Sequence, residues 1–150
     1  MIHATVHWTN HADDFDKHRY SRAHTWMFDG GLQVPASSSP DIVAVPMSDS
    51  SAVDPEEAFV ASLSSCHMLW FLSIAAKAGF ALQDYRDQAV GEMKSNDDGK
   101  LSIAIVTLHP VITWSGTTVP TANEVHQMHR QAHEECFIAN SVKTEVRIES

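Results

Sequence analysis

The segment spanning residues 53–80 is the most hydrophobic part of the chain and places the strongest constraint on its fold. It opens with Asp54, a good helix N-cap, followed by a proline that suits the first helical position. Glu57 stands where a capping box has its acid, and Gly79 supplies a stop at the other end. These signals predict one helix over residues 55–78, about 36 Å long if it is unbroken.

The centre of this helix is apolar almost all round, which is typical of a helix enclosed by other elements. Its window from 58 to 76 is apolar enough to raise the question of a membrane span. Four serines and His67 interrupt that window, so we expect a core helix and no membrane. The N-terminus has no basic stretch before an apolar run, so we expect no signal peptide and a cytoplasmic protein.

The remaining segments alternate between strand-like and helix-like patterns. Alternating apolar and polar residues predict the strands, which lie at residues 2–8, 20–28, 87–95, 100–114 and 142–149. A Pro- and Ser-rich stretch over 35–52 predicts a long surface loop, of the kind that often forms a lid or a substrate rim. Thr121 and Glu124 form a second capping box, which predicts a helix through about Glu135.

This order of elements predicts an α+β fold in which strands grouped in hairpins surround buried helices. The chain has 150 residues and shows neither a repeat nor a linker, so we expect a single domain over residues 1–150. Its formal net charge of −9 disfavours nucleic acid and anionic membranes as partners, because both require a basic face.

The chain has two cysteines, and each falls on an apolar helical segment. Cys66 lies in the long helix beside four small residues, namely Ala61, Ser62, Ser64 and Ser65. Cys136 follows the apolar side of the second helix, which carries Val125, Met128 and Ala132. Free cysteines are often simply buried. In a reducing compartment the alternatives are a metal site or a redox pair, and the small neighbours of Cys66 favour close approach by a substrate.

A reactive thiol needs a nearby cation to be useful as a thiolate. Arg22 is the best candidate, because in the strand over 20–28 it shares a face with Tyr20, His24, Trp26 and Phe28. Arg19 is the fallback, and His67 points roughly 100° away from Cys66 along the helix.

An inward arginine needs a carboxylate partner, which Glu56 or Glu57 would supply. Glu56 and Cys66 are about 15 Å apart along a straight helix and cannot touch. If they share a site, an arginine bridges them, the helix breaks, or a second chain completes the site.

Two motifs carry a resemblance to a known family. DPEEAFVASLSSC, residues 54–66, resembles the signature of the OsmC/Ohr family of hydroperoxide-reducing proteins, in which an acidic helix start leads through small residues to a reactive cysteine. HEECFIANSV, residues 133–142, is similar to the family's second motif, a cysteine at the end of the second long helix. With the order of the elements, the resemblance covers nearly the whole chain.

The resemblance implies antiparallel sheets wrapped around two long central helices in an intertwined homodimer. It implies that Cys66 is the peroxidatic thiolate, Cys136 the resolving thiol, and Glu56 the residue that holds the site arginine, which we assign to Arg22. The implied activity is a thiol peroxidase in oxidative stress defence. It would reduce organic hydroperoxides to alcohols through a sulfenic acid and an intramolecular disulfide. A lipoyl group or another dithiol would regenerate it, with no cofactor or metal.

Three departures point to a divergent OsmC-like subgroup. The loop over 35–52 is longer than the usual connection, and the bulky run HMLWFL follows Cys66. Phe137 stands after Cys136, where many members have proline. Outside this family, His129 and His133 have the spacing of helical zinc ligands, with Glu134 and Cys136 nearby, so a metal-binding module is one alternative. A non-catalytic domain that binds a small molecule in the same fold is another.

Overall fold

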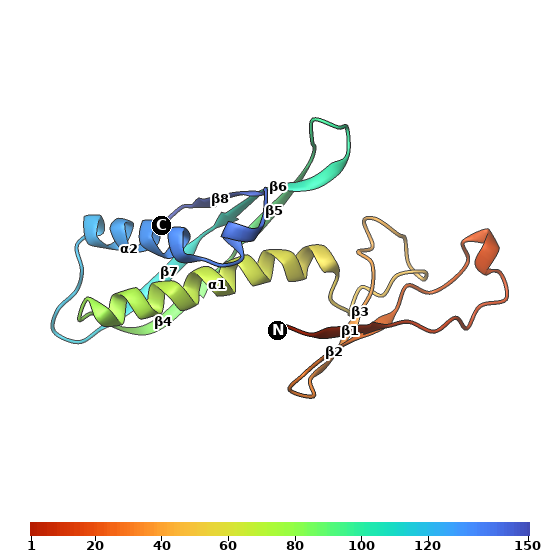
Figure 1. The fold of residues 1–150 in the computed structure, drawn as a ribbon, viewed down its shortest axis with the longest axis horizontal. Helices are drawn as coiled ribbons and strands as arrows, with labels where there is room; N and C mark the ends of the chain where they lie inside the picture. The colour runs from red at the N-terminus through yellow and green to blue at the C-terminus, as the bar shows by residue number, and fades with distance from the viewer. The chain divides into compact units, whose positions relative to one another are not determined.

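The computed structural model describes all residues from Met1 to Ser150. They divide into two compact units, residues 1–58 and residues 59–150, and helix α1 (Pro55–Lys77) begins in the first unit and continues through the second. Figure 1 shows the elements of each unit along the chain.

The first unit contains a three-stranded antiparallel sheet in the order β1–β2–β3. Its strands are β1 (Ala4–His7), β2 (His24–Phe28) and β3 (Gln33–Ala36), and a short 3₁₀ turn, η1 (Phe15–Lys17), lies between the first two. The first two strands confirm the prediction from alternation, although β2 starts later than expected. Strand β3 takes in the first residues of the predicted loop, because an edge strand tolerates Pro35 there.

Helix α1 begins and ends where the local signals predicted. The Asp54 carboxylate accepts the Glu57 backbone N–H at 2.8 Å, and the Glu57 carboxylate accepts the Asp54 N–H at 3.2 Å, which makes a complete capping box. After the last turn, Gly79 adopts a φ of +84°, a left-handed conformation that favours glycine. The buried positions of α1 recur every four residues, at Leu63, His67, Phe71 and Ala75.

The second unit has two further sheets. Strands β4 (Ala81–Asp87) and β7 (Pro110–Ser115) form an antiparallel pair. Strands β5 (Val90–Ser95) and β6 (Leu101–Leu108) form a hairpin, and β8 (Glu145–Ile148) adds to β6 in parallel. The closing strand was predicted, but its parallel pairing was not.

The predicted strand over 100–114 is wrong as a single element, because it is divided between the two sheets at His109. The His109 backbone N–H donates to the Asp87 carboxylate at 2.6 Å, and the next residue is a proline that lacks an N–H. The chain therefore leaves the β6 ladder and begins β7 against β4. Strand β4 was missed altogether.

Helix α2 (Ala122–Glu135) carries the capping box that the sequence predicted, with the Thr121 hydroxyl and the Glu124 carboxylate each accepting the other residue's backbone N–H. Its buried residues are Met128, His129 and Ala132, and Cys136 caps its C-terminal end. A second 3₁₀ turn, η2 (Ala139–Ser141), leads towards β8.

The core of the second unit lies on both sides of α1. Phe71 and Ala75 of α1 pack with Met128 and Ala132 of α2 over the β4–β7 sheet. Leu63 packs with Val106 and Leu108 of β6. Helix α1 thus packs against both sheets, which confirms that it is a central helix.

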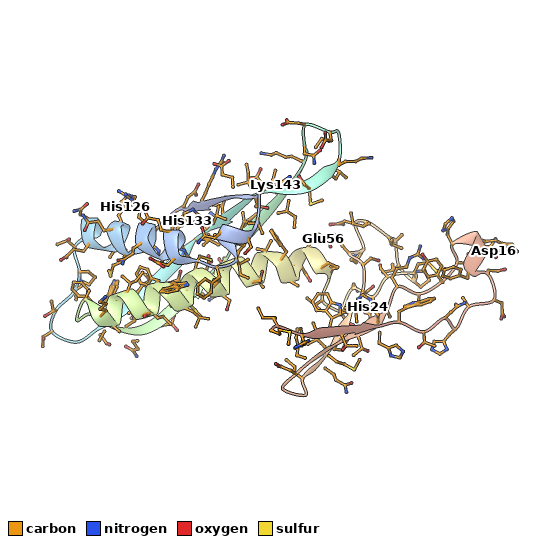
Figure 2. The ribbon with its side chains drawn as sticks, viewed as in Figure 1. Asp16, His24, Glu56, His126, His133 and Lys143 are labelled. Carbon is orange, nitrogen blue, oxygen red and sulfur yellow. The ribbon has the colours of Figure 1, made fainter.

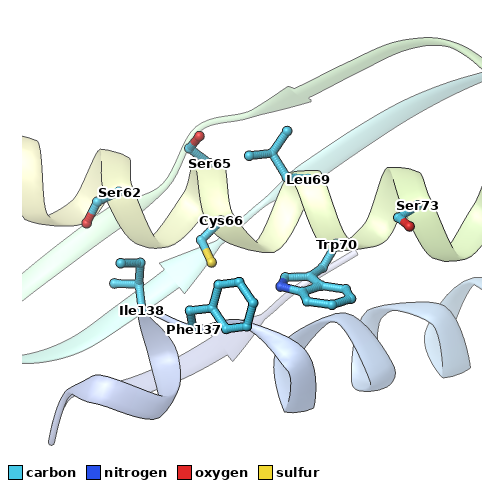
Figure 3. Close-up of a pocket in the computed structure, with 8 residues that line it drawn as sticks. All are labelled: Ser62, Ser65, Cys66, Leu69, Trp70, Ser73, Phe137 and Ile138. Carbon is cyan, nitrogen blue, oxygen red and sulfur yellow. The ribbon is translucent and has the colours of Figure 1, made fainter. Parts of the chain in front are cut away.

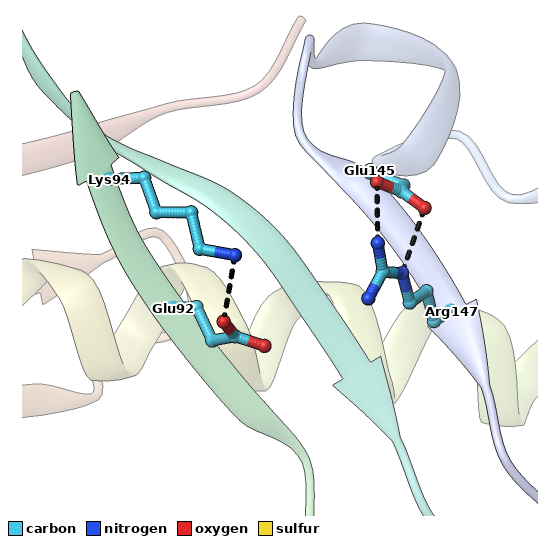
Figure 4. Close-up of polar contacts among 4 residues, drawn as sticks. All are labelled: Glu92, Lys94, Glu145 and Arg147. Carbon is cyan, nitrogen blue, oxygen red and sulfur yellow. Dashed lines mark hydrogen bonds and ion pairs between the residues drawn. The ribbon is translucent and has the colours of Figure 1, made fainter. Parts of the chain in front are cut away.

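The outer face of the β5–β6–β8 sheet carries two exposed ion pairs, Glu92 with Lys94 at 3.0 Å and Glu145 with Arg147 at 2.8 Å (Figure 4). Exposed pairs of this kind contribute about 0–1 kcal/mol each. They leave this face mixed in charge, without a basic patch.

Helix α1 is long and apolar enough to cross a membrane by length and composition alone, and 22% of its most apolar window is buried within the single chain. The core helix of a soluble protein meets the same criterion. Most residues of this window are half-buried in one copy of the chain, and Leu69 is 60% exposed.

Candidate functional site

Cys66 lies in the middle of α1, where its half-buried thiol opens onto an apolar pocket. The pocket has a volume of about 520 Å³. It is lined by α1 and by the segment after α2, through Ser62, Ser65, Cys66, Leu69, Trp70, Ser73, Phe137 and Ile138. Figure 3 shows the sulfur directed from α1 towards Phe137 and Ile138. The small serines that the sequence singled out therefore form part of the pocket wall.

Cys136 is 1% exposed at the end of α2, and both cysteines are free. Burial raises the pKa of the Cys136 thiol, and the neighbouring Cys66 thiol raises it further. The backbone N–H of Ala139 donates to the Cys136 sulfur at 3.4 Å, and this hydrogen bond lowers the pKa of the thiol. The two thiols are therefore neighbours, one facing the pocket and the other buried behind it.

An aromatic pair forms one end of the pocket. The rings of Trp70 and Phe137 meet edge to face, with their centroids 5.5 Å apart. Phe137 is 70% exposed, so it lies at the mouth of the pocket. The residue that departs from the family pattern after Cys136 thus contributes directly to the wall beside Cys66.

Arg22 belongs to the first unit, where it lies in the segment before β2 and not in the strand predicted for it. Its guanidinium stacks over the Tyr20 ring at 3.7 Å. It also donates to the carbonyl oxygens of Tyr20 at 2.6 Å and His18 at 3.2 Å. Arg22 lines a pocket of about 480 Å³ whose aromatic wall consists of Trp8, Phe15 and Tyr20.

Glu56 lies half-buried in the first turn of α1 (Figure 2). It forms no ion pair with Arg22, whose positive charge is held by carbonyl oxygens and an aromatic ring instead. Glu57 takes the capping role that the sequence assigned to it. Arg19, the fallback candidate, is 67% exposed and lies 3.7 Å from Asp14. Of the two arginines, Arg22 is the one that lines a pocket.

A pair of buried histidines was missed by the sequence interpretation. His67 of α1 is 1% exposed and His129 of α2 is 2% exposed, and the His67 Nε2 lies 2.9 Å from the His129 Nδ1. The spacing of His67 from Leu63 and Phe71, four residues on either side, was the available signal. His129 was considered only as a zinc ligand, and the structure has no group of three or more side chains that could hold a metal ion.

Comparison with known proteins gives one family. Residues 48–150 match the model of the family described as OsmC-like protein. No match is found among curated proteins.

Among solved structures, an OsmC-like protein of unknown function from Vibrio cholerae is 53% identical, with a TM-score of 0.97, 99% of this chain covered and 97% of the other. An organic hydroperoxide resistance protein from Legionella pneumophila is 18% identical, with a TM-score of 0.71 and coverages of 99% and 93%. The organic hydroperoxide resistance protein OhrB of Bacillus subtilis is 17% identical, with a TM-score of 0.69 and coverages of 99% and 96%. The similarity to the Legionella and Bacillus proteins shows a shared fold alone.

The family match spans both cysteines, and the fold agrees over nearly the whole chain with that of the Vibrio protein, at an identity well above chance. The α+β architecture predicted from the sequence is the one these proteins share. This chain is therefore a member of the OsmC/Ohr family.

Proposed function

We propose that the protein is a thiol peroxidase that reduces organic hydroperoxides to alcohols in defence against oxidative stress. The observation that carries the proposal is the pair of neighbouring thiols at an apolar pocket, Cys66 facing the pocket and Cys136 buried beside it. The names of the Legionella and Bacillus relatives support the same substrate class. The apolar wall favours substrates with a hydrocarbon group over small polar peroxides.

The reaction begins with the Cys66 thiolate attacking one peroxide oxygen. The O–O bond breaks, the departing alkoxide takes a proton to become an alcohol, and Cys66 is left as a sulfenic acid. The Cys136 thiol then attacks the Cys66 sulfur and releases water, which leaves a disulfide. A cellular dithiol, lipoyl or another, restores both thiols by exchange and is itself oxidised to a disulfide.

Arg22 would supply the positive charge that keeps Cys66 ionised and orients the peroxide. In the single chain, carbonyl oxygens and the Tyr20 ring hold the Arg22 guanidinium. Glu56 makes no ion pair there, and it would pair with Arg22 when the site assembles. The protein would act in the cytoplasm without a cofactor, metal or nucleic acid.

We propose that the working form is a homodimer. Leu69 is 60% exposed on α1, and most residues of the apolar window of this helix are only half-buried in a single chain. A second copy that covered this surface would gain roughly 25 cal/mol for each square ångström buried. The second copy would also supply Arg22 to the site. Its Arg22 and Glu56 would meet Cys66 of the first copy, because Glu56 and Cys66 of one straight helix cannot touch.

The test is a thiol count with mass measurement on the reduced protein after one equivalent of cumene hydroperoxide. We expect both thiols to disappear and the mass to fall by two hydrogens. Cys66→Ser should abolish the reaction, whereas Cys136→Ser should leave a sulfenic acid that a dimedone probe captures on Cys66. A non-catalytic binding protein would keep both thiols under these conditions, and that outcome would refute the proposed peroxidase.

A further inference from the structure

The two buried histidines of the second unit take no part in the proposed reaction. They lie between the two helices that carry the thiols, and their hydrogen bond is the one that joins α1 to α2. The ring planes of His67 and His129 are within 8° of parallel. Within this bond one facing ring nitrogen donates a proton and the other accepts it, so the bond is lost when both rings are charged and both facing nitrogens carry a proton.

The position of the pair ties it to the sulfur atoms. His67 follows Cys66 directly on α1, and His129 belongs to the helix that Cys136 caps. Because backbone hydrogen bonds keep each helix rigid, a bond between these two side chains sets the rotation and register of one cysteine against the other. The remaining contact between the helices is made by apolar side chains such as Phe71 and Met128, whose packing is not directional.

We propose that His67 and His129 are positioning residues, whose neutral hydrogen bond holds α1 and α2 in the register that brings the Cys66 and Cys136 thiols together. The proposal concerns the disulfide step and so rests on the proposed function for its biological meaning. The geometry it invokes lies wholly within the second unit.

The surroundings keep the pair neutral. Burial lowers the pKa of both histidines to about 4. On α2, His133 and His126 oppose a positive charge on the pair, while Asp87 of β4 favours a charge on His67. Tyr85 of β4 also lies in this region and stays neutral, because burial raises its pKa. The Nδ1 of His67 and the Nε2 of His129 are buried without a partner, so a charged ring would find no acceptor there.

These pKa values determine how the hydrogen bond between the histidines responds to pH. Above about pH 6.5 the rings are neutral in both folded and unfolded chains, and the bond is intact. As the pH falls below 4, protonation of both rings places an N–H on both facing nitrogens and breaks the bond. We therefore expect acid to separate the thiols.

The experiment measures the equilibrium constant for disulfide formation against glutathione, with a diselenide catalyst that stays active in acid. In this exchange the protein dithiol and glutathione disulfide give protein disulfide and two glutathione molecules, with no net proton change. Two double variants are compared with the unmodified chain, at pH 7 and at pH 3. His67→Gln with His129→Asn keeps a neutral hydrogen bond at the same atoms, because Gln reproduces the Nε2 position and Asn the Nδ1 position. His67→Leu with His129→Leu removes the bond and leaves no unpaired group.

For the leucine variant we expect the equilibrium constant to fall about tenfold at pH 7, with little change in unfolding free energy, as loss of one hydrogen bond implies. The Gln/Asn variant should match the unmodified chain at pH 7 and keep its constant at pH 3, well below the histidine pKa of about 4, where the unmodified chain loses about tenfold or more. An unchanged constant in the leucine variant would overturn the proposal.

Identical pH dependence in the unmodified and Gln/Asn chains would also overturn it. Should either variant fail to fold, the pH titration of the unmodified chain decides. A constant that does not change from pH 7 to 3 refutes the role of the pair. A fall that follows the imidazole titration, observed by NMR, supports it. Peroxide consumption is measured separately, so a chain with this disulfide behaviour and no peroxidase activity would refute the proposed function alone.

Discussion

Single side chains determine how the two thiols differ. Cys66 is half-buried and faces a pocket, whereas Cys136 is buried and has a raised pKa. In the proposed reaction, a peroxide reaching the pocket from solvent would meet the first thiol, and the second would be protected from direct oxidation until Cys66 had reacted. This difference in exposure supports the division into peroxidatic and resolving roles that the family resemblance implies.

A single glycine controls the approach of β5 to α1. A Cβ added at Gly91 would lie 2.7 Å from the Cγ2 of Val60, whose branched side chain has little rotamer freedom in a helix. We expect Gly91→Ala to destabilise the protein by about 1–3 kcal/mol, measured by urea unfolding.

Two controls separate this contact from a general effect of alanine. Gly30→Ala, at a site with no atom within 4 Å of the added Cβ, should have little effect. Combining Gly91→Ala with Val60→Ala should cost less than the sum of the two single variants. Strict additivity would show that the contact is not the cause.

At the level of elements, the two helices begin with complete capping boxes, and the apolar face of α2 packs against α1. The ends of α1 and α2 therefore depend on contacts three residues apart, while their relative placement depends on side chains far apart in the sequence. The serines of α1 also have different surroundings. Ser64 donates to the Asp87 carboxylate, whereas Ser62 and Ser65 face the pocket.

The capping box of α2 gives a prediction at this level. Thr121→Ala removes the hydroxyl that accepts the Glu124 backbone N–H, so we expect a loss of about 1 kcal/mol and a fall of roughly 2–4 °C in Tm. Thr121→Ser keeps the acceptor and should retain most of the stability. Equal losses in both variants, in thermal unfolding followed by circular dichroism, would show that the methyl group of Thr121 matters more than the cap.

At the level of the whole molecule, Arg22 belongs to the first unit and Cys66 to the second. A homodimer would allow one copy to provide the arginine and the other the cysteine. The single domain expected over residues 1–150 stays a prediction, since the family match covers residues 48–150 and the chain forms two compact units.

Mixed dimers test this sharing directly. One chain carries Arg22→Ala, the other Cys66→Ser, and the two are co-expressed with different tags so that the mixed species is purified. If the site is shared between copies, one of its two sites is complete, and we expect about half the activity of the unmodified dimer. Inactive mixed dimers that fold normally would place Arg22 and Cys66 of the same chain in one site. Monomers in sedimentation experiments would contradict the dimer itself.

Much of what concerns helices was predictable from local sequence. Asp54 with Glu57, Thr121 with Glu124, and Gly79 determined where the helices begin and end, because capping bonds join groups a few residues apart. The motif around Cys66 also indicated the family and hence the α+β fold, which the comparisons confirm.

The tertiary structure alone decided which distant groups meet. The division of the predicted strand at His109, the parallel pairing of β8 and the bond between His67 and His129 all join residues far apart in the chain. Such contacts form only when the folded backbone brings two surfaces together and their packing repays the lost chain entropy. The sequence by itself therefore determined the helices and the chemical identity of the thiols, while the fold decided that Cys66 faces an apolar pocket and Cys136 lies beside it.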